Sequence, residues 1–143
     1  MRICFIPIDN RPICYSLPKD IIEQDKDIKL LLPKREFLGG VIAPGINTQM
    51  KCLNKSTSKL PKIDVSISQN AIGHNTTDAI LSGVIRGTAC MVDGLVAQCE
   101  AELGEKAIIV ATGGYCGLIA NYLKRPFDYT NPILTLEGLK KIY

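Results

Sequence analysis

The chain contains no tryptophan, one histidine and only three phenylalanines among its 143 residues. The single histidine, His74, cannot build a zinc site alone, because such sites take several nitrogen or sulfur ligands. The six cysteines form no C-x-x-C pair. We interpret them as reduced core thiols rather than as disulfides or metal ligands. The sequence therefore predicts no metal site.

Long apolar runs are also lacking, and none approaches the span of a membrane helix. The apolar start of the chain is interrupted by Asp9, Asn10 and Pro12, which excludes a signal peptide. We therefore expect a cytoplasmic protein with no membrane partner. The net charge of +3 comes from scattered Lys and Arg without an aromatic-interleaved basic stripe, so nucleic-acid binding is not expected.

The sequence does contain enough apolar residues to form a hydrophobic core. Hydrophobic residues make up 46% of the chain and charged residues 22%, which indicates one folded domain or part of one. The segment "RICFIPI", 2–8, is typical of a buried strand, and "IKLLLP", 28–33, of a second one. Ser16 is a candidate cap for a short helix that runs to about Gln24 between them. The order predicts a short βαβ unit with a parallel strand pair.

The clearest element is a helix over 75–104, where apolar and small residues recur at helical spacing. Asn75 or Thr76 is expected to cap its start, and Gly104 to end it. Glycines inside a helix lower its stability, so we expect another backbone to approach closely at these three: Gly83, Gly87 and Gly94.

Weaker patterns surround this helix. The stretch 37–47 is typical of a loop, and 47–60 of a weak helix capped by Asn47. A short strand or extended segment is expected over 62–67, a buried strand over 106–112 and a helix directly after it. Thr135 is the expected cap of a terminal helix that reaches Tyr143. This alternation predicts an α/β protein.

The strand "KAIIVAT" ends in Thr112-Gly113-Gly114. Such a turn leaves N–H groups unpaired at a helix start, and glycine lets a ligand approach the backbone. On spacing alone two interpretations stay open: a ligand site, or a tight β–α turn packed for its own sake.

Five stretches, taken in order, resemble the C-terminal part of type III pantothenate kinases. They are "LGGVIAPGI" (38–46), "KLPKIDV" (59–65), "AIGHNTTDAILSGVIRGTACMVDGLV" (71–96), "IIVATGGYCGLIA" (108–120) and "NPILTLEGLKKIY" (131–143). The resemblance covers 37–143 and implies part of an actin-like, sugar-kinase, Hsp70-type ATPase lobe. It also implies an activity: the transfer of a phosphoryl group from ATP to pantothenate, the first step of coenzyme A synthesis.

The resemblance assigns roles to two places. Thr112, Gly113 and Gly114 match the turn that borders the adenosine side of ATP. Thr76 matches the position that contacts pantothenate from a neighbouring subunit, although a threonine at this place can also be a simple helix cap. The glycine-bearing helix resembles the one that packs in the family's homodimer, so a homodimer is expected.

Other parts of the family pattern do not occur in this sequence. The D-x-G-N-T turn, the G-A-D-R stretch with the carboxylate base and the D-F-G-T-x-T-T stretch are all absent. No catalytic residue is therefore assigned, and the family's monovalent cation (potassium or ammonium) has no ligand here. Because phosphoryl transfer depends on positioning and charge stabilisation, we expect the isolated chain to be inactive.

Residues 1–36 resemble instead the start of an uncharacterised bacterial family that opens I-x-x-x-P-L-D-x-R-P, and no role transfers from it. Asp9 is interpreted as a turn residue rather than as a cation ligand. Three hypotheses follow for the whole chain. It is a kinase-like enzyme that needs a partner chain, a non-catalytic nucleotide-binding or dimerisation module, or a truncated or fused gene product.

Overall fold

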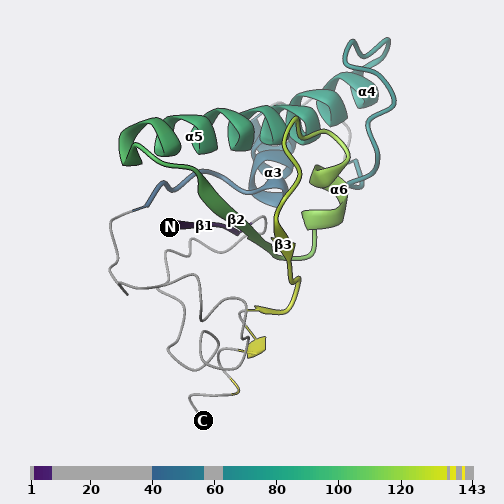
Figure 1. The fold of residues 1–143 in the computed structure, drawn as a ribbon. Coiled ribbons are helices and arrows are strands. Elements are labelled where there is room, and N and C mark those ends of the chain that lie inside the picture. The colour runs from purple at the N-terminus through teal and green to yellow at the C-terminus, as the bar shows by residue number, and fades with distance from the viewer. Residues whose placement is uncertain (1, 8–39, 57–62, 135, 138–139, 141–143) are drawn as a thin grey trace.

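A computed structural model describes residues 2–7, 40–56, 63–134, 136, 137 and 140. The fold is α/β, as predicted, with a small parallel sheet and helices packed beside it (Figure 1). Its elements, in chain order, are β1 (Arg2–Pro7), α3 (Ile46–Ser56), α4 (Thr76–Leu81), η1 (Ser82–Arg86), α5 (Gly87–Leu103), β2 (Ala107–Thr112), α6 (Cys116–Ala120) and β3 (Tyr129–Thr130).

The sheet has the order β1-β2-β3 with both pairs parallel. β1 pairs with β2 from Arg2↔Ala107 to Pro7↔Thr112. All but one of the residues of β2 are buried, as expected for the central strand of a parallel sheet. β3 was not predicted, because two exposed residues leave no periodic signal. The expected strand 28–33 and the helix capped by Ser16 lie outside the described residues.

The long helix is confirmed and runs through α4, η1 and α5 as one rod of 28 residues, 76–103. Gly104 ends it in the left-handed conformation, with φ of 70° and its N–H donated to Glu100 O. The π-helical segment η1 was not predicted. In Figure 1 the rod lies along one side of the strands, with α3 and α6 beside its N-terminal half.

By length and composition this rod is able to cross a membrane, with a mean hydropathy of 1.5 in its most apolar window. The expectation that no segment reaches that span is therefore wrong. It overlooked small residues, which lengthen the apolar stretch without looking hydrophobic. Yet 44% of that window is buried inside the protein, and the core helix of a globular protein passes the same test. This observation alone supports no membrane location.

Two adjoining groups of buried side chains form the core between the rod and the sheet. The larger includes Ile46 of α3, Ile85 of η1, Ala111 of β2 and Ile119 of α6. The smaller joins Val92, Val96 and Ile109, and Leu123 and Phe127 pack against both. Burying this apolar surface is the main stabilising contribution to the fold.

The cysteine prediction is partly wrong. Cys116 is fully buried in the core, but Cys52 and Cys90 are exposed, one on α3 and the other on the outward side of α5. None of the cysteines described beyond β1 forms a disulfide. Within the described part of the chain, no cluster of three potential metal ligands occurs.

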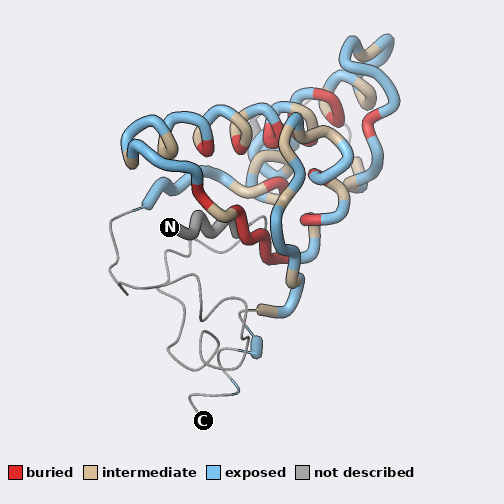
Figure 2. The backbone as a smooth tube through the Cα atoms, viewed as in Figure 1, coloured by how far each residue is buried: buried red, intermediate tan, exposed pale blue. Residues whose placement is uncertain are grey.

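The three helix glycines do not meet another backbone within the described residues, contrary to prediction. A Cβ on Gly83, Gly87 or Gly94 would meet nothing within 4 Å. They lie on the exposed side of the rod, which is pale blue in Figure 2, whereas its buried residues face the sheet. Together with three other small residues they form an outward row, which we call the small-residue row: Gly83, Gly87, Cys90, Gly94, Ala97 and Ala101.

Of three further local predictions, one is wrong. Helix α3 begins at Ile46 and is not capped by Asn47, whose side chain accepts a hydrogen bond from Tyr115. No strand forms over 63–67, which leaves the extended segment of the two predicted alternatives. Near the C-terminus, Asn131 Oδ1 accepts the Ile133 N–H at a helical turn, and Thr135 lies outside the described residues.

Candidate functional site

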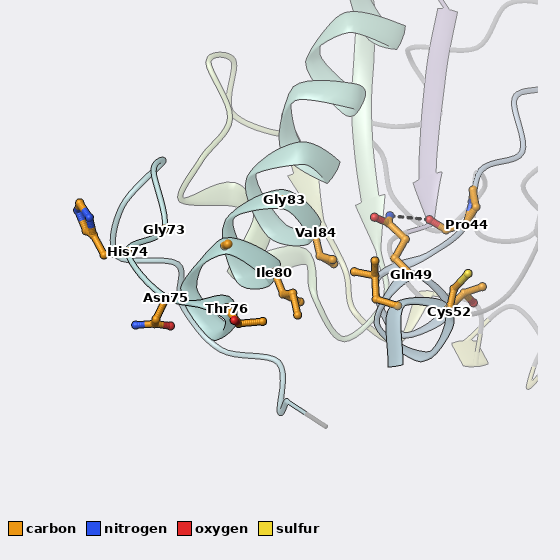
Figure 3. A pocket seen from close by; sticks show the side chains of 13 residues that line it. Pro44, Gln49, Cys52, Gly73, His74, Asn75, Thr76, Ile80, Gly83 and Val84 are labelled. Carbon is orange, nitrogen blue, oxygen red and sulfur yellow. Dashed lines mark hydrogen bonds between the residues drawn. The ribbon is translucent and has the colours of Figure 1, made fainter. Parts of the chain in front are cut away.

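A groove of about 960 Å3 lies between helix α3 and the start of the rod (Figure 3). The side chains of Thr76 and Ile80 project toward α3, whereas His74 lies at the outer end and points away from it. The lining residues come from three segments: Pro44 with Thr48, Gln49, Cys52 and Leu53; Gly73, His74 and Asn75; and Thr76, Ala79, Ile80, Gly83 and Val84. The groove thus combines an apolar wall with hydroxyl and amide groups.

The end of the rod that faces this groove is capped by Asn75, not by Thr76. Asn75 Oδ1 accepts the Asp78 N–H at 2.9 Å, and Asn75 Nδ2 donates to Asp78 Oδ2 at 2.7 Å. Thr76 is the first helical residue and is exposed. Its hydroxyl forms no hydrogen bond with any residue that the structure describes. The simple capping role for Thr76 is therefore excluded, and its side chain forms part of the lining of the groove.

The opposite wall is tied to the rod by a residue that the sequence did not single out. Gln49 Nε2 donates to Pro44 O at 2.9 Å and to Thr88 Oγ1 at 3.2 Å. Thr88 Oγ1 in turn donates to Val84 O at 2.6 Å. A glutamine in a weak amphipathic helix carries no signal for this bridge, because its partner lies 39 residues away.

The turn after β2 lies outside the groove. Gly113 has a φ of 105°, which an L side chain rarely adopts, so glycine is required there. A Cβ on Gly114 would meet nothing within 4 Å, so the backbone is open to solvent at this point. The Thr112 hydroxyl is buried without a partner among the described residues. A buried hydroxyl without a hydrogen-bond partner, close to a glycine with an accessible backbone, is suited to a polar ligand.

The helix that follows this turn contributes less than the sequence suggested. α6 has only five residues, so its dipole is small and the anion argument carries little weight. The structure does not bring Thr76 and the turn 112–114 into one cavity. It connects them indirectly, since Tyr115, next to the turn, donates a hydrogen bond to Asn47 Oδ1 at the start of α3.

The strongest electrostatic perturbation lies at the other end of the rod. The pKa of Glu100 falls from its usual 4.5 to about 2, chiefly because the carboxylate accepts the Ala107 N–H and further hydrogen bonds from Arg125 and Lys106. The same contact with Glu100 raises the pKa of Arg125. Arg125 also donates to Ala107 O at 2.7 Å. This network anchors the start of β2 and touches neither candidate ligand position.

The comparison with known proteins decides the family. The sequence profile of type III pantothenate kinase matches residues 27–98. This chain belongs to the type III pantothenate kinase family. A type III pantothenate kinase of Dehalococcoides mccartyi (strain CBDB1) is 51% identical over 108 residues, and one of Myxococcus xanthus (strain DK1622) is 43% identical over 111 residues. The resemblance found in the sequence is confirmed.

The match to these type III pantothenate kinases is partial in length. The alignments cover 76% and 78% of this chain but only 41% and 43% of the two relatives. A relative from Desulforapulum autotrophicum is 34% identical over an alignment that covers 92% of this chain and 59% of its own length. The profile match begins at residue 27, ahead of the predicted boundary between 1–36 and 37–143. That boundary stays a prediction.

Proposed function

We propose that this chain is a pantothenate kinase-like polypeptide that binds pantothenate in the groove at Thr76 and the adenosine part of ATP at the turn 112–114. As an isolated chain it transfers no phosphoryl group. The observation that carries the proposal is the groove at the N-terminus of the rod. Asn75 caps the helix there, so the Thr76 side chain does not serve as the cap. The family membership and the names of the relatives give the substrates their identity.

The groove suits a small acid with an apolar middle. The rod has 28 residues, so its N-terminal end carries a positive potential that favours a carboxylate. The Thr76 hydroxyl offers a donor there, and Ile80 and Val84 offer apolar contact farther along. Asp78, in the first turn, weakens this potential, so modest affinity is expected.

The nucleotide position is supported by the open backbone at Gly114 and the positive φ of Gly113. Because the phosphate-binding stretches of the family are absent from the sequence, only adenosine contacts remain. ATP and adenosine are therefore expected to bind with similar affinity. The cation ligand of the family is absent as well, so binding is expected to be independent of potassium or ammonium.

The proposed architecture is part of an actin-like lobe that assembles as a homodimer in the cytoplasm. The small-residue row leaves the outward side of the rod without bulky side chains, which allows close helix packing between two copies. The competing hypothesis is a non-catalytic nucleotide-binding or dimerisation module. It is favoured by the missing carboxylate base, and it differs in predicting no pantothenate site.

Calorimetry with pantothenate tests the proposal on the wild-type chain and on Thr76→Ala. Thr77→Ala is the matched control, since Thr77 is the next residue but does not line the groove. We expect Thr76→Ala to weaken pantothenate binding by about tenfold, the loss of one hydrogen bond to a charged group, and Thr77→Ala to leave it unchanged. Equal affinity in all three proteins, or no binding at all, contradicts the pantothenate site.

Turnover assays test the inactivity of the isolated chain. The chain is incubated with ATP and pantothenate, alone and mixed with a full-length homologue such as the Dehalococcoides mccartyi kinase. We expect no phosphopantothenate from the chain alone. Formation at an ordinary enzyme rate, with contaminants excluded, overturns this part of the proposal and favours an undetected phosphate site.

A further inference from the structure

One wall of the groove belongs to a loop, 68–75, that has no helix or strand of its own. Its backbone needs external partners to hold one conformation, because irregular segments lack a ladder of internal hydrogen bonds. The structure supplies these partners mainly from η1, the π-helical segment of the rod, and from Tyr122. π-helical insertions are rare and occur frequently at functional sites.

The far end of η1 holds the start of the loop. Arg86 Nε donates to Ser68 Oγ, and Arg86 Nη2 donates to the carbonyl oxygens of Ser68 and Gln69, all at 3.1 Å. The guanidinium carbon lies 4.7 Å from the ring centroid of Tyr122, in cation–π contact. Arg86 forms no ion pair with a carboxylate in the part of the chain that the structure describes. Its positive charge therefore interacts with carbonyl groups of the loop.

Ser68 is the fixed point of this arrangement and is only 4% exposed. The Tyr122 hydroxyl accepts the Ser68 N–H at 2.8 Å and donates to Ser68 O at 3.0 Å. Every polar group of Ser68 thus has a partner, as a buried polar residue requires. Arg86 and Tyr122 together clamp one residue of an otherwise irregular loop.

The near end of η1 holds the middle of the loop. Ser82 Oγ donates to Ala71 O at 2.6 Å. Two residues later the loop passes directly over the first turn of the rod, since a Cβ on Gly73 would lie 2.2 Å from Ala79 N. The loop then continues through His74 to the cap Asn75 and so to Thr76, all of which line the groove.

We propose that Arg86 is a positioning residue for the acidic substrate: by clamping Ser68 and Gln69 it fixes the loop wall that leads to Thr76. The inference rests on the proposed pantothenate site and adds a role for η1. Arg86 does not touch the ligand, since it is not a lining residue of the groove. Its effect is transmitted by the loop.

The sole histidine makes the test direct, because His74 lies in this loop wall and gives the only imidazole signals of the chain. Pantothenate binding to the intact chain is measured by calorimetry, and the His74 ring resonances are followed by NMR as a separate report on the conformation of the loop. The variants are Arg86→Met, which removes the clamp, and Arg86→Lys, which keeps a charge over Tyr122. Lys51→Met, an exposed position on α3 that does not line the groove, is the charge-matched control.

Arg86→Met is expected to weaken pantothenate binding by about tenfold, to shift the His74 signals of the free protein and to leave adenosine affinity within about twofold. Arg86→Lys is expected to recover part of the loss, and Lys51→Met to behave as wild type. Should Arg86→Met fail to fold, Ser82→Ala removes one hydrogen bond that holds the loop, and Tyr122→Phe removes the two that its hydroxyl forms with Ser68. Each is expected to weaken binding about two- to fivefold.

Two outcomes overturn the inference and are distinguishable. If the wild-type chain shows no pantothenate-dependent change, the proposed function fails and the substrate role of Arg86 fails with it. If the wild type binds but the clamp variants bind within twofold of it, with unchanged His74 signals, the proposed function stands and Arg86 is merely structural.

Discussion

The hydroxyl of Tyr115 donates a hydrogen bond of 2.9 Å to Oδ1 of Asn47, which lies 68 residues earlier in the chain. The bond joins the turn after β2 to the first turn of α3. Since the turn carries the proposed adenosine position and α3 forms one wall of the groove, this bond connects the two candidate ligand positions.

Replacing Tyr115 by Phe removes the bond and keeps the ring. We expect the free energy of unfolding to fall by about 1 kcal/mol, the usual net contribution of one hydrogen bond. Urea unfolding followed by circular dichroism measures this change. Tyr129→Phe is the control, because the Tyr129 ring is exposed and its hydroxyl bonds to no described residue. Equal losses in both variants contradict a specific role for the Tyr115–Asn47 bond.

Gly73→Ala is expected to destabilise the protein by about 1–3 kcal/mol, the range for overpacking. The added Cβ would meet Ala79 N at 2.2 Å and Ala79 Cα at 2.5 Å, and neither backbone atom is able to move aside easily. Gly117→Ala is the matched control within α6, where a Cβ meets nothing within 4 Å. That control is expected to be neutral or slightly stabilising, since alanine favours helix over glycine. Thermal or urea unfolding measures the stability of each variant relative to the wild type. An equal loss in both variants contradicts the predicted overpacking at Gly73.

The Glu100 network predicts a specific acid sensitivity. Because folding lowers the pKa of Glu100 from 4.5 to about 2, its stabilising contribution is fully present above the higher value and is lost as the pH falls toward the lower one. Glu100→Gln is expected to lower stability near neutral pH, and the difference from wild type is expected to shrink steadily over this acid window.

Urea midpoints measured across that pH range test this expectation. Glu102→Gln is the control, because Glu102 is exposed on the same helix and forms no ion pair with the described residues. A difference between wild type and Glu100→Gln that stays constant with pH is incompatible with the proposed protonation linkage.

Gly114→Val is expected to abolish adenosine binding and to leave the fold intact. A Cβ at this position meets nothing within 4 Å in the free protein and Gly114 has no positive φ, so the substitution is expected to obstruct mainly a ligand that lies close to the backbone. Gly113→Ala is the contrasting variant. Because Gly113 has a φ of 105°, any side chain there strains the backbone, and the variant is expected to destabilise the turn itself. Calorimetry with adenosine and with ATP, beside an unfolding curve, separates the two effects.

Gly87→Leu is expected to weaken self-association by placing a large side chain in the small-residue row. Glu102→Leu, on the same helix but outside the row, is the control for added apolar surface. Light scattering at high micromolar concentration gives the mass of each variant. A wild-type chain that stays monomeric under these conditions ends the homodimer proposal.

Sequence reasoning succeeded where a feature repeats along the chain or is encoded locally. The helical spacing of Val84, Val92 and Val96 located the rod, and Gly104 ended it as expected. The apolar run 107–112 located the central strand. These features follow from backbone hydrogen bonding and burial on one face, both of which leave a pattern in neighbouring residues.

The errors and omissions concern contacts between distant residues. Nothing in the sequence near Arg86 indicates that its partners are Ser68 and Tyr122, and nothing near Gln49 indicates Thr88. The glycines of the rod were expected to meet another backbone, but they meet none within the described residues, because a glycine pattern does not reveal which side of a helix faces the core. The residues of the turn 112–114 left a ligand site and a tight turn both open, and the roles of both candidate ligand positions came from the family resemblance and stay predictions.

The pairing of β1 with β2 joins strands that lie about a hundred residues apart in the sequence. The loop-closure entropy of such a pairing is unfavourable until β2 is available, so the contact forms late during folding. The rod has no such requirement for its backbone hydrogen bonds, which join residues only a few positions apart. As the chain leaves the ribosome, β1 is therefore unable to form this pairing until β2 has emerged, and the edge of β1 that pairs with β2 stays open to association with other strand edges during that interval.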